Sequence, residues 1–146
     1  MIDVKVTKLS SEATLPTKAH STDAAFDLYA NCPDYTMMVP AHGKALIGTG
    51  IAVAIPEGYF GGVYARSGLA SKNGIRPSNC VGVIDSPYRG EIMVSLHNDT
   101  DKDYVVIHGT RIAQLIIQPC PPVALVEVNE LDSTDRGKGG FGSSGK

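Results

Sequence analysis

Residues 91–118 read EIMVSLHNDTDKDYVVIHGTRIAQLIIQ, and this stretch decides the fold class. Its first part places Ile92, Val94 and Leu96 at every second position, which is the period of a β-strand with one buried face. Residues 98–103, NDTDKD, follow with the Asn and Asp residues that favour tight turns. The stretch therefore predicts short strands joined by turns.

Similar segments recur along the chain, whose 16 glycines, 9 prolines and absence of tryptophan suit many turns. Turns are expected at residues 40–43, 56–58 and 86–90. Strands are expected at residues 2–7, 35–39, 44–55, 59–64, 91–97, 104–107, 111–118 and 123–128. In the first of these, Ile2, Val4 and Val6 alternate with polar residues, which again predicts one buried face. Many short strands between turns are typical of a β-sandwich, jelly roll or barrel, so the predicted fold class is all-β.

One short helix is expected over residues 67–73, because Leu69, Ala70 and Lys72 favour a helix and Gly74 can end it. After residue 131 the composition changes, and residues 132–146, DSTDRGKGGFGSSGK, contain five glycines and three serines. Such a segment buries too little to order itself and is expected to be mobile unless a ligand holds it. The 146 residues thus predict one β domain, 1–131, followed by a flexible arm, 132–146.

Composition excludes several classes of function. The formal net charge is −2, which lacks the basic excess expected of a protein that binds long nucleic acids. Cys32, Cys80 and Cys120 are odd in number and form no CxxC pair, so neither a disulfide framework nor a zinc site is predicted. The sequence has no apolar run of about 18 residues and no export signal, so we expect an intracellular, cytoplasmic protein with reduced thiols.

Two segments have the residue types that bind phosphate. Arg66-Ser67-Gly68 lies just before the expected helix, where a guanidinium, a hydroxyl and backbone N–H groups can converge on an anion. In the arm, Arg136 is followed by glycines whose backbone can approach phosphate oxygens closely, while Phe141 offers a face on which a base can stack. A structural surface arginine and a disordered chain end remain the alternatives, and neither segment is a Walker loop.

Two aspartates lie in apolar surroundings. Asp27 is flanked by apolar residues in AAFDLYA, and Asp85 ends the run CVGVID before a Ser-Pro turn. An acid at the end of an apolar strand can activate water or hold Mg²⁺ through bound waters, and it can equally cap a turn. The histidines have no recognisable Ser or Cys partner by spacing, so we interpret them as surface or core residues: His20, His42, His97 and His108.

Five of these segments, in this order, resemble the signature motifs of the homotrimeric dUTP pyrophosphatases, or dUTPases. The segments are residues 24–30 (AAFDLYA), 56–72 (from PEG to RSGLASK), 82–91 (GVIDSPYRGE, with Asn79 just ahead), 109–116 (GTRIAQLI) and 136–145 (RGKGGFGSSG). Single motifs are weakly specific, but the ordered set spans nearly the whole chain.

The resemblance implies a jelly-roll-like fold in a threefold trimer whose active sites take motifs from all three chains. It implies hydrolysis of dUTP to dUMP and pyrophosphate, which limits uracil incorporation into DNA and supplies dUMP for dTMP synthesis. Asp85 would activate the water that attacks the α-phosphorus, and Asp27 would help to hold Mg²⁺ through its water shell. The arm would close over nucleotide held at a neighbouring subunit interface.

The remaining roles also follow from the resemblance. The α- and β-phosphates would be faced by Arg66, Ser67, Gly68 and Gln114, and the γ-phosphate by Arg136, Ser143 and Ser144. Uracil and deoxyribose would be bound by Asn79, Gly82, Val83, Ile84, Tyr88 and Phe141. A hairpin from about residue 79 to residue 88 would pair its backbone with the uracil edge, and Tyr88 would leave no room for a 2′-hydroxyl.

Two departures from the family pattern stand out. Ala25 occupies a position where the family usually has glycine, which puts any need for positive φ there in question. Ser86-Pro87 replaces a commoner acidic or glycine-bearing pair, and the proline suits a turn that stiffens the placement of Tyr88.

Two other functions compete with this reading. A dCTP deaminase shares the fold, but its relatives look to carry a glutamate where this chain has Ser95, and without that acid deamination loses its proton carrier. A non-catalytic nucleotide sensor or capsid-like jelly roll would have little use for Asp85 in its GVID context.

Overall fold

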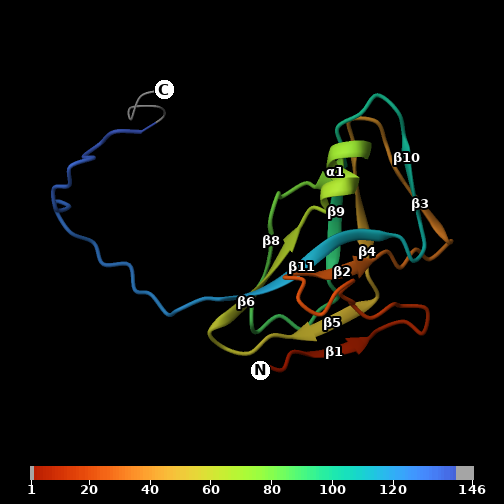
Figure 1. Ribbon diagram of the computed structural model, residues 1–146, viewed down its shortest axis with the longest axis horizontal. Helices are drawn as coiled ribbons and strands as arrows, with labels where there is room; N and C mark the ends of the chain where they lie inside the picture. Colours follow the sequence, from red (N-terminus) through yellow and green to blue (C-terminus); the bar gives the residue numbers. More distant parts are fainter. Residues whose placement is uncertain (1, 141–146) are drawn as a thin grey trace.

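The computed structural model describes residues 2–140, and these residues form eleven strands and one short helix (Figure 1). In chain order the elements are β1 (Lys5–Lys8), β2 (Phe26–Tyr29), β3 (Thr36–Val39), β4 (Lys44–Gly48), β5 (Ile51–Ala54), β6 (Tyr59–Tyr64), α1 (Ser67–Asn73), β7 (Ile75–Pro77), β8 (Gly82–Ile84), β9 (Met93–Asn98), β10 (Tyr104–Ile107) and β11 (Arg111–Pro119). The all-β prediction with one short helix is confirmed. No helix of residues 2–140 is long and apolar enough to cross a membrane.

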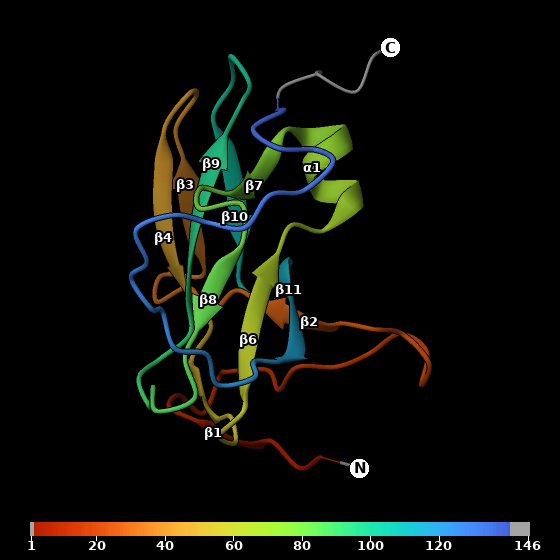
Figure 2. The ribbon, with the colours of Figure 1, turned by 90° about the vertical axis from the view of Figure 1, so that its left-hand side faces the viewer.

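The strands pair antiparallel in four sheets around one core. The sheet orders are β2-β11-β6-β8, β4-β9-β7, β1-β5 and β10-β3. Figure 2 shows β3, β4 and β9 on one side of the molecule and β2, β6 and β11 on the other. All four sheets contribute buried side chains, for example Leu28, Ile47, Ile51 and Val106. The apolar faces of the sheets therefore share a single interior.

The stretch that predicts the fold behaves as expected. Ile92, Val94 and Leu96 are all buried. Asn98 is buried as well, and its Nδ2 donates hydrogen bonds to the carbonyls of Val39 and Lys102, at 3.1 and 2.8 Å. Because this amide replaces missing backbone partners, it fixes the turn that follows β9 without leaving polar atoms unsatisfied.

Helix α1 ends where the sequence predicts. Gly74 has φ 66° and ψ 23°, the left-handed conformation in which glycine commonly ends a helix, and its N–H donates to the Ala70 carbonyl at 3.1 Å. The helix therefore has fixed bounds, and its first residues, Ser67 and Gly68, remain exposed at the end of β6.

The predicted strand 44–55 is two strands, because the chain turns at Thr49 and Gly50. Gly50 has φ 65°, and the Thr49 hydroxyl donates to the carbonyl of Ile92 at 2.7 Å. Both features interrupt the extended backbone, so β4 and β5 join different sheets.

Two predictions of buried apolar faces are wrong for the single chain. The strand predicted over residues 2–7 is observed as Lys5–Lys8, all four of whose residues are exposed, with Val6 at 40%; of the predicted face only Val4, just before the strand, packs against the core. Residues 123–128 form no strand, and Val123 and Leu125 are 83% and 100% exposed. Alternation shows which side chains prefer burial, but it does not supply the surface that covers them.

The segment after β11 runs away from the strands (Figure 1). The N–H of Cys120 donates to the Gly58 carbonyl at 2.7 Å, at the point where the segment leaves the body. Farther along, Gly137 donates to Thr134 and Gly139 donates to Arg136, so these hydrogen bonds are local. The domain boundary at residue 131 stays a prediction.

Candidate active site

A cleft of about 480 Å³ opens beside the start of α1. It is built where β2, the junction between β6 and α1, and β11 meet. Its lining residues are Ala19, Asp23, Ala24, Ala25, Asp27, Arg66, Ser67, Gly68, Arg111, Gln114 and Ile116. The first, second and fourth motifs thus come together, and five predicted site residues lie in this phosphate cleft, as we name it hereafter.

Two arginines contact the Asp27 carboxylate in the phosphate cleft. The Nε of Arg66 lies 2.8 Å from Oδ1 of Asp27, and Nη1 of Arg111 lies 3.1 Å from Oδ2. The side chains of Asp27 and Arg66 are 15% and 26% exposed, so their contact is largely shielded from bulk water, whereas the Arg111 side chain is 48% exposed. The lining also contains Asp23, so its two arginines are balanced by two aspartates, and an anion would be bound by the guanidinium, hydroxyl and N–H donors rather than by an excess of charge.

Backbone pairing fixes the position of Gln114. In β11 this residue lies opposite Asp27 of β2 and opposite Tyr64 of β6. Its Nε2 donates to the carbonyl of Ala65 at 2.8 Å, which leaves the other N–H and the amide oxygen for a ligand. Arg66 caps α1 in an extended conformation, with φ −81° and ψ 128°, so the chain turns into the helix at the cleft wall.

Sequence reasoning missed two charged residues of the cleft lining, Asp23 and Arg111. Arg111 is the one that contacts Asp27. It is quoted within the fourth motif, but regular strand alternation places it on the opposite face from Gln114. A register shift between Arg111 and Ala113 turns it back into the cleft, and the sequence carries no signal for that shift.

A smaller pocket of about 160 Å³ lies at the end of β8. Its lining residues are Val83, Ile84, Asp85, Tyr88, Glu91 and Met93. The N–H of Tyr88 donates to the Asp85 carbonyl at 3.1 Å and thereby closes the turn through Ser86 and Pro87. We call this hollow the β8 pocket; it contains four of the predicted site residues, including Asp85.

The Tyr88 ring is fixed at both ends of the turn. Its hydroxyl donates to the carbonyl of Glu91 at 2.9 Å. The ring also passes so close to Gly90 that any Cβ at that position would collide with the hydroxyl oxygen. A larger residue at position 90 would therefore displace the Tyr88 ring from its place at the β8 pocket.

The predicted hairpin over residues 79–88 is wrong. Gly82–Ile84 pair with β6, and the strand before them, β7, pairs with β9. Asn79 is exposed and lies beside buried Gly82, where its Nδ2 is 3.3 Å from the position a Cβ would take. Neither residue lines the β8 pocket, although both lie next to it in the chain.

Arg136, the one predicted site residue of the arm that the structure describes, lines neither cavity. The Nε of Arg136 donates to the carbonyl of Gly139 at 3.0 Å, within the arm. Phe141, Ser143 and Ser144 lie outside the described residues. Asp27 and Asp85 line different cavities, so one copy of the chain does not assemble all the predicted groups.

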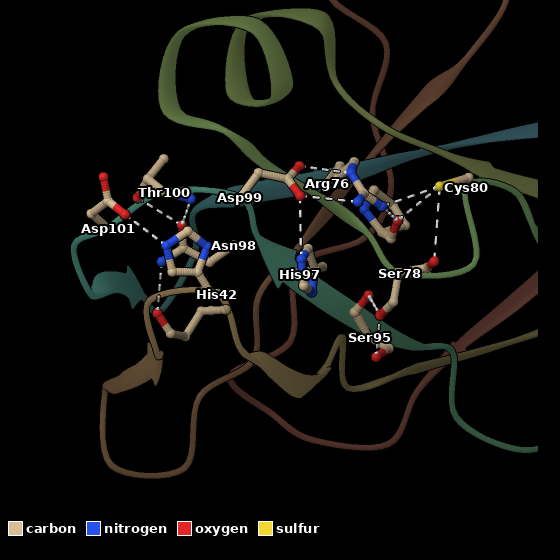
Figure 3. Close-up of polar contacts among 12 residues, drawn as sticks. His42, Arg76, Ser78, Cys80, Ser95, His97, Asn98, Asp99, Thr100 and Asp101 are labelled. Atoms are coloured by element: carbon tan, nitrogen blue, oxygen red, sulfur yellow. Dashed lines mark hydrogen bonds and ion pairs between the residues drawn. The ribbon is translucent and has the colours of Figure 1, made fainter.

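A third polar cluster lies around β7 and β9, outside both cavities (Figure 3). The Nε and Nη2 of Arg76 donate to the two Asp99 oxygens at 2.7 and 3.0 Å, and these hydrogen bonds hold the pKa of Asp99 below its usual range. His97 lies 3.2 Å from the same carboxylate. Ser95, which stands where a dCTP deaminase is expected to have a glutamate, has its hydroxyl oxygen 2.6 Å from that of Ser78.

The departure at Ala25 costs no backbone strain. Among the described residues the only non-glycine positions with positive φ are Tyr35, His42 and Cys80. Ala25 therefore adopts an ordinary conformation. Within residues 2–140, no group of three or more His, Cys, Asp or Glu side chains is placed to hold a metal ion.

Comparison with known proteins identifies the same family that the five motifs resemble. The sequence model of the dUTPase family matches residues 11–145. The deoxyuridine 5′-triphosphate nucleotidohydrolase of Syntrophotalea carbinolica is 47% identical over 144 residues, which cover 99% of this chain and 97% of that protein. A probable enzyme of the same name from Schizosaccharomyces pombe is 49% identical over 142 residues, covering 96% of each chain.

The solved structures that resemble this chain are also dUTPases. The Staphylococcus bacteriophage 80alpha dUTPase with dUPNHPP has a TM-score of 0.91 and 32% identity, covering 100% of each chain. A variant dUTPase from phage phi11 of S. aureus, reported to reveal the coordination of a structural Mg(II) ion, has a TM-score of 0.80 and 28% identity, covering 90% of this chain and 100% of the other. In sequence and in fold, the chain belongs to the dUTPase family.

Proposed function

We propose that this chain hydrolyses dUTP to dUMP and pyrophosphate, in the cytoplasm, with Mg²⁺ and with active sites shared among three copies of the chain. The observation that supports the proposal is the phosphate cleft, in which Arg66, Gln114 and Asp27, each from a different motif, line one hollow. Cytoplasmic thiols stay reduced, which suits the free cysteines Cys32, Cys80 and Cys120.

Asp85 is the proposed general base. It takes a proton from a water molecule as the water oxygen bonds to the α-phosphorus. The bond from that phosphorus to the bridging oxygen breaks, and pyrophosphate leaves. Asp85 follows β8 directly and is exposed in the single chain, so its carboxylate is accessible to a substrate water. A base positioned in this way typically contributes about 10²–10⁴ to the rate.

The phosphate cleft stabilises negative charge on the transferring oxygens. Arg66, the Ser67 hydroxyl, the Gly68 backbone and the free N–H of Gln114 would face the α- and β-phosphates. Arg136, Ser143 and Ser144 of an arm would face the γ-phosphate. Each preorganised donor is worth roughly 3 kcal/mol of barrier, by analogy with oxyanion holes.

The donor set of the phosphate cleft fits Mg²⁺. This ion usually keeps several waters and is bound through one or two carboxylates together with substrate phosphates, and Asp27 supplies one carboxylate there. When bound, the ion neutralises charge on the phosphate oxygens and orients them. Asp27 would accept hydrogen bonds from its water shell.

The β8 pocket would bind the nucleoside. Backbone groups near Asn79, Gly82, Val83 and Ile84 would pair with the uracil edge, and cytosine would leave those buried groups unpaired. Sites of that kind discriminate by about 10⁴ or more, whereas excluding the thymine methyl requires a rigid wall. The fixed Tyr88 ring would pack on deoxyribose and exclude a 2′-hydroxyl, and Phe141 would stack on the base.

Sharing among chains explains why one copy separates the predicted groups. The phosphate cleft, the β8 pocket and the arm each carry part of the constellation, and a threefold assembly would place one of each around one triphosphate. The exposed apolar residues of β1 and of residues 123–128 offer surface for such contacts.

A substrate assay tests the proposal directly. Purified protein is incubated with Mg²⁺ and, separately, with dUTP, dCTP, dTTP and UTP, while pyrophosphate and ammonia are followed. Pyrophosphate from dUTP alone is the expected result. Ammonia from dCTP would instead indicate a deaminase, and no product from any nucleotide would indicate a sensor.

The Asp85→Asn variant tests the base. We expect turnover to fall at least about a hundredfold while dUTP affinity stays nearly unchanged, because the amide keeps the shape but accepts no proton. Single-turnover rates and equilibrium binding separate the two effects. Near-normal turnover would remove Asp85 from this role.

A further inference from the structure

A bulge in β11 determines where Arg111 points. Residues 111 and 114 are three positions apart and would face opposite sides of a regular strand. Between Arg111 and Ala113 the pairing with β2 shifts, so that Arg111 lies opposite Tyr29 while Gln114 lies opposite Asp27. Ile112 and Ala113 are both buried, as two consecutive inward residues at a bulge must be. The bulge thus turns Arg111 onto the face that carries Asp27.

The two arginines contact different oxygens of the Asp27 carboxylate. Arg66 donates to Oδ1 and Arg111 donates to Oδ2. Arg66 is also the group that the proposed function directs at the substrate phosphates, so an arriving triphosphate competes with Asp27 for its guanidinium. Arg111 comes from β11, and its contact is with the other oxygen, so it does not depend on Arg66.

We propose that Arg111 is a positioning residue for Asp27: it keeps the carboxylate correctly oriented toward the hydrated Mg²⁺ of the bound substrate, and it does not itself bind the phosphates. This inference rests on the proposed function. A planar guanidinium fixes the direction of a carboxylate in a way that a lysine ammonium does not. The Arg111 side chain is 48% exposed, and a pair of that exposure contributes little to stability, so its role lies in orientation.

The experiment compares wild type, Arg111→Gln, Arg111→Lys, Asp27→Asn and the double variant Asp27→Asn with Arg111→Gln, all as full chains. Calorimetry measures the Kd of a non-hydrolysable α,β-imido analogue of dUTP, once with Mg²⁺ and once with EDTA. Lys102→Gln is the control, because it removes an equal charge from the exposed turn after β9. Its binding and activity should match wild type.

We expect Arg111→Gln to weaken binding of the Mg²⁺ complex by about tenfold or more, as lost supporting contacts at metal sites usually do. Binding in EDTA should change less than about twofold, because the phosphates keep their own partners. The double variant should be no worse than Asp27→Asn alone, since Arg111 acts through Asp27. Arg111→Lys should restore part of the loss, and it also serves if the Gln variant folds poorly.

Several results would overturn the positioning role. Equal losses with and without Mg²⁺, or additive losses in the double variant, would make Arg111 a direct phosphate ligand. Unchanged binding in Arg111→Gln would leave it without a role. Hydrolysis of dUTP by wild type is measured on the same preparations: a wild type that neither hydrolyses dUTP nor binds the analogue overturns the proposed function as well, whereas an active one confines the failure to Arg111.

Discussion

At the scale of single residues, the three thiols lie in different surroundings. Cys32 is 5% exposed, and burial raises its pKa, whereas Cys80 and Cys120 are exposed. Because the thiolate is the reactive form, Cys32 lacks both access and ionisation. Iodoacetamide at pH 8 should modify Cys80 in the native protein and Cys32 only after denaturation in urea. Peptide mass mapping checks this, and native labelling of Cys32 as fast as Cys80 would contradict it.

The Arg76 and Asp99 pair predicts a pH dependence of stability. The folded-state pKa of Asp99 lies below the unfolded value of about 3.9, so folding favours its ionised form. The resulting stabilisation is complete above about pH 4 and is lost as pH falls through the folded value. Asp99→Asn should therefore lower the Tm at pH 7, by a few degrees at most because the pair is exposed, and the difference from wild type should shrink as the pH falls below about 4.

Thermal melts of both proteins between pH 2 and pH 7 measure the effect. A difference that grows toward acid pH would assign the opposite sign to the interaction. Asp101→Asn is a suitable companion, because Asp101 is a more exposed carboxylate on the same turn and contacts His42.

At the scale of elements, the end of α1 should be the most sensitive point of the short helix. Gly74 is left-handed, which costs other residues roughly 1–2 kcal/mol, and a Cβ there would lie 2.6 Å from Cγ2 of Thr100. Gly74→Ala should lower stability by at least about that amount, as measured by the urea midpoint. Gly68→Ala is the control for stability, since nothing lies within 4 Å of its added methyl.

Locally determined elements could be predicted from the sequence to the residue. The observed bounds of β6, β10 and α1 equal the predicted ones, because turn residues and a helix-ending glycine mark them. The face of β1 and the state of residues 123–128 could not be predicted, since both depend on surfaces that local alternation does not describe.

The candidate site was predictable in its parts and not in its geometry. Motif order identified Asp27, Arg66 and Gln114 as neighbours, and the phosphate cleft contains all three. Arg111 was missed as a cleft residue because one extra residue in β11 reverses the direction of its side chain, and bulges depend on pairing between distant strands.

At the scale of the whole molecule, the hydrogen bonds of residues 132–140, the described part of the arm, all lie within the arm itself. A chain that ends at Asp135 removes Arg136 and the fifth motif while keeping every strand of the body. We expect this truncation to preserve trimer assembly and to lower kcat/KM by about 10³ or more, because at least one phosphate donor worth about 10²–10³ is lost together with the lid.

Light scattering checks the assembly state, and dUTP hydrolysis checks activity. Arg136→Gln is the matched single substitution and should reproduce most of the loss with the arm intact. Full activity in the truncated chain would refute the closing arm.

The segment after β11 runs outward from its own strands. A variant with a defective body and a variant with a defective arm could therefore each supply the part that the other lacks. Asp85→Asn and the chain ending at Asp135 are each expected to be inert. When the two variants are unfolded together and refolded, mixed assemblies should form and regain measurable turnover. Some of their shared active sites would receive an intact Asp85 from the truncated chain and an intact arm from the Asp85→Asn chain. Turnover should therefore appear only in the mixture of the two variants, and it should fall again when either variant is in large excess.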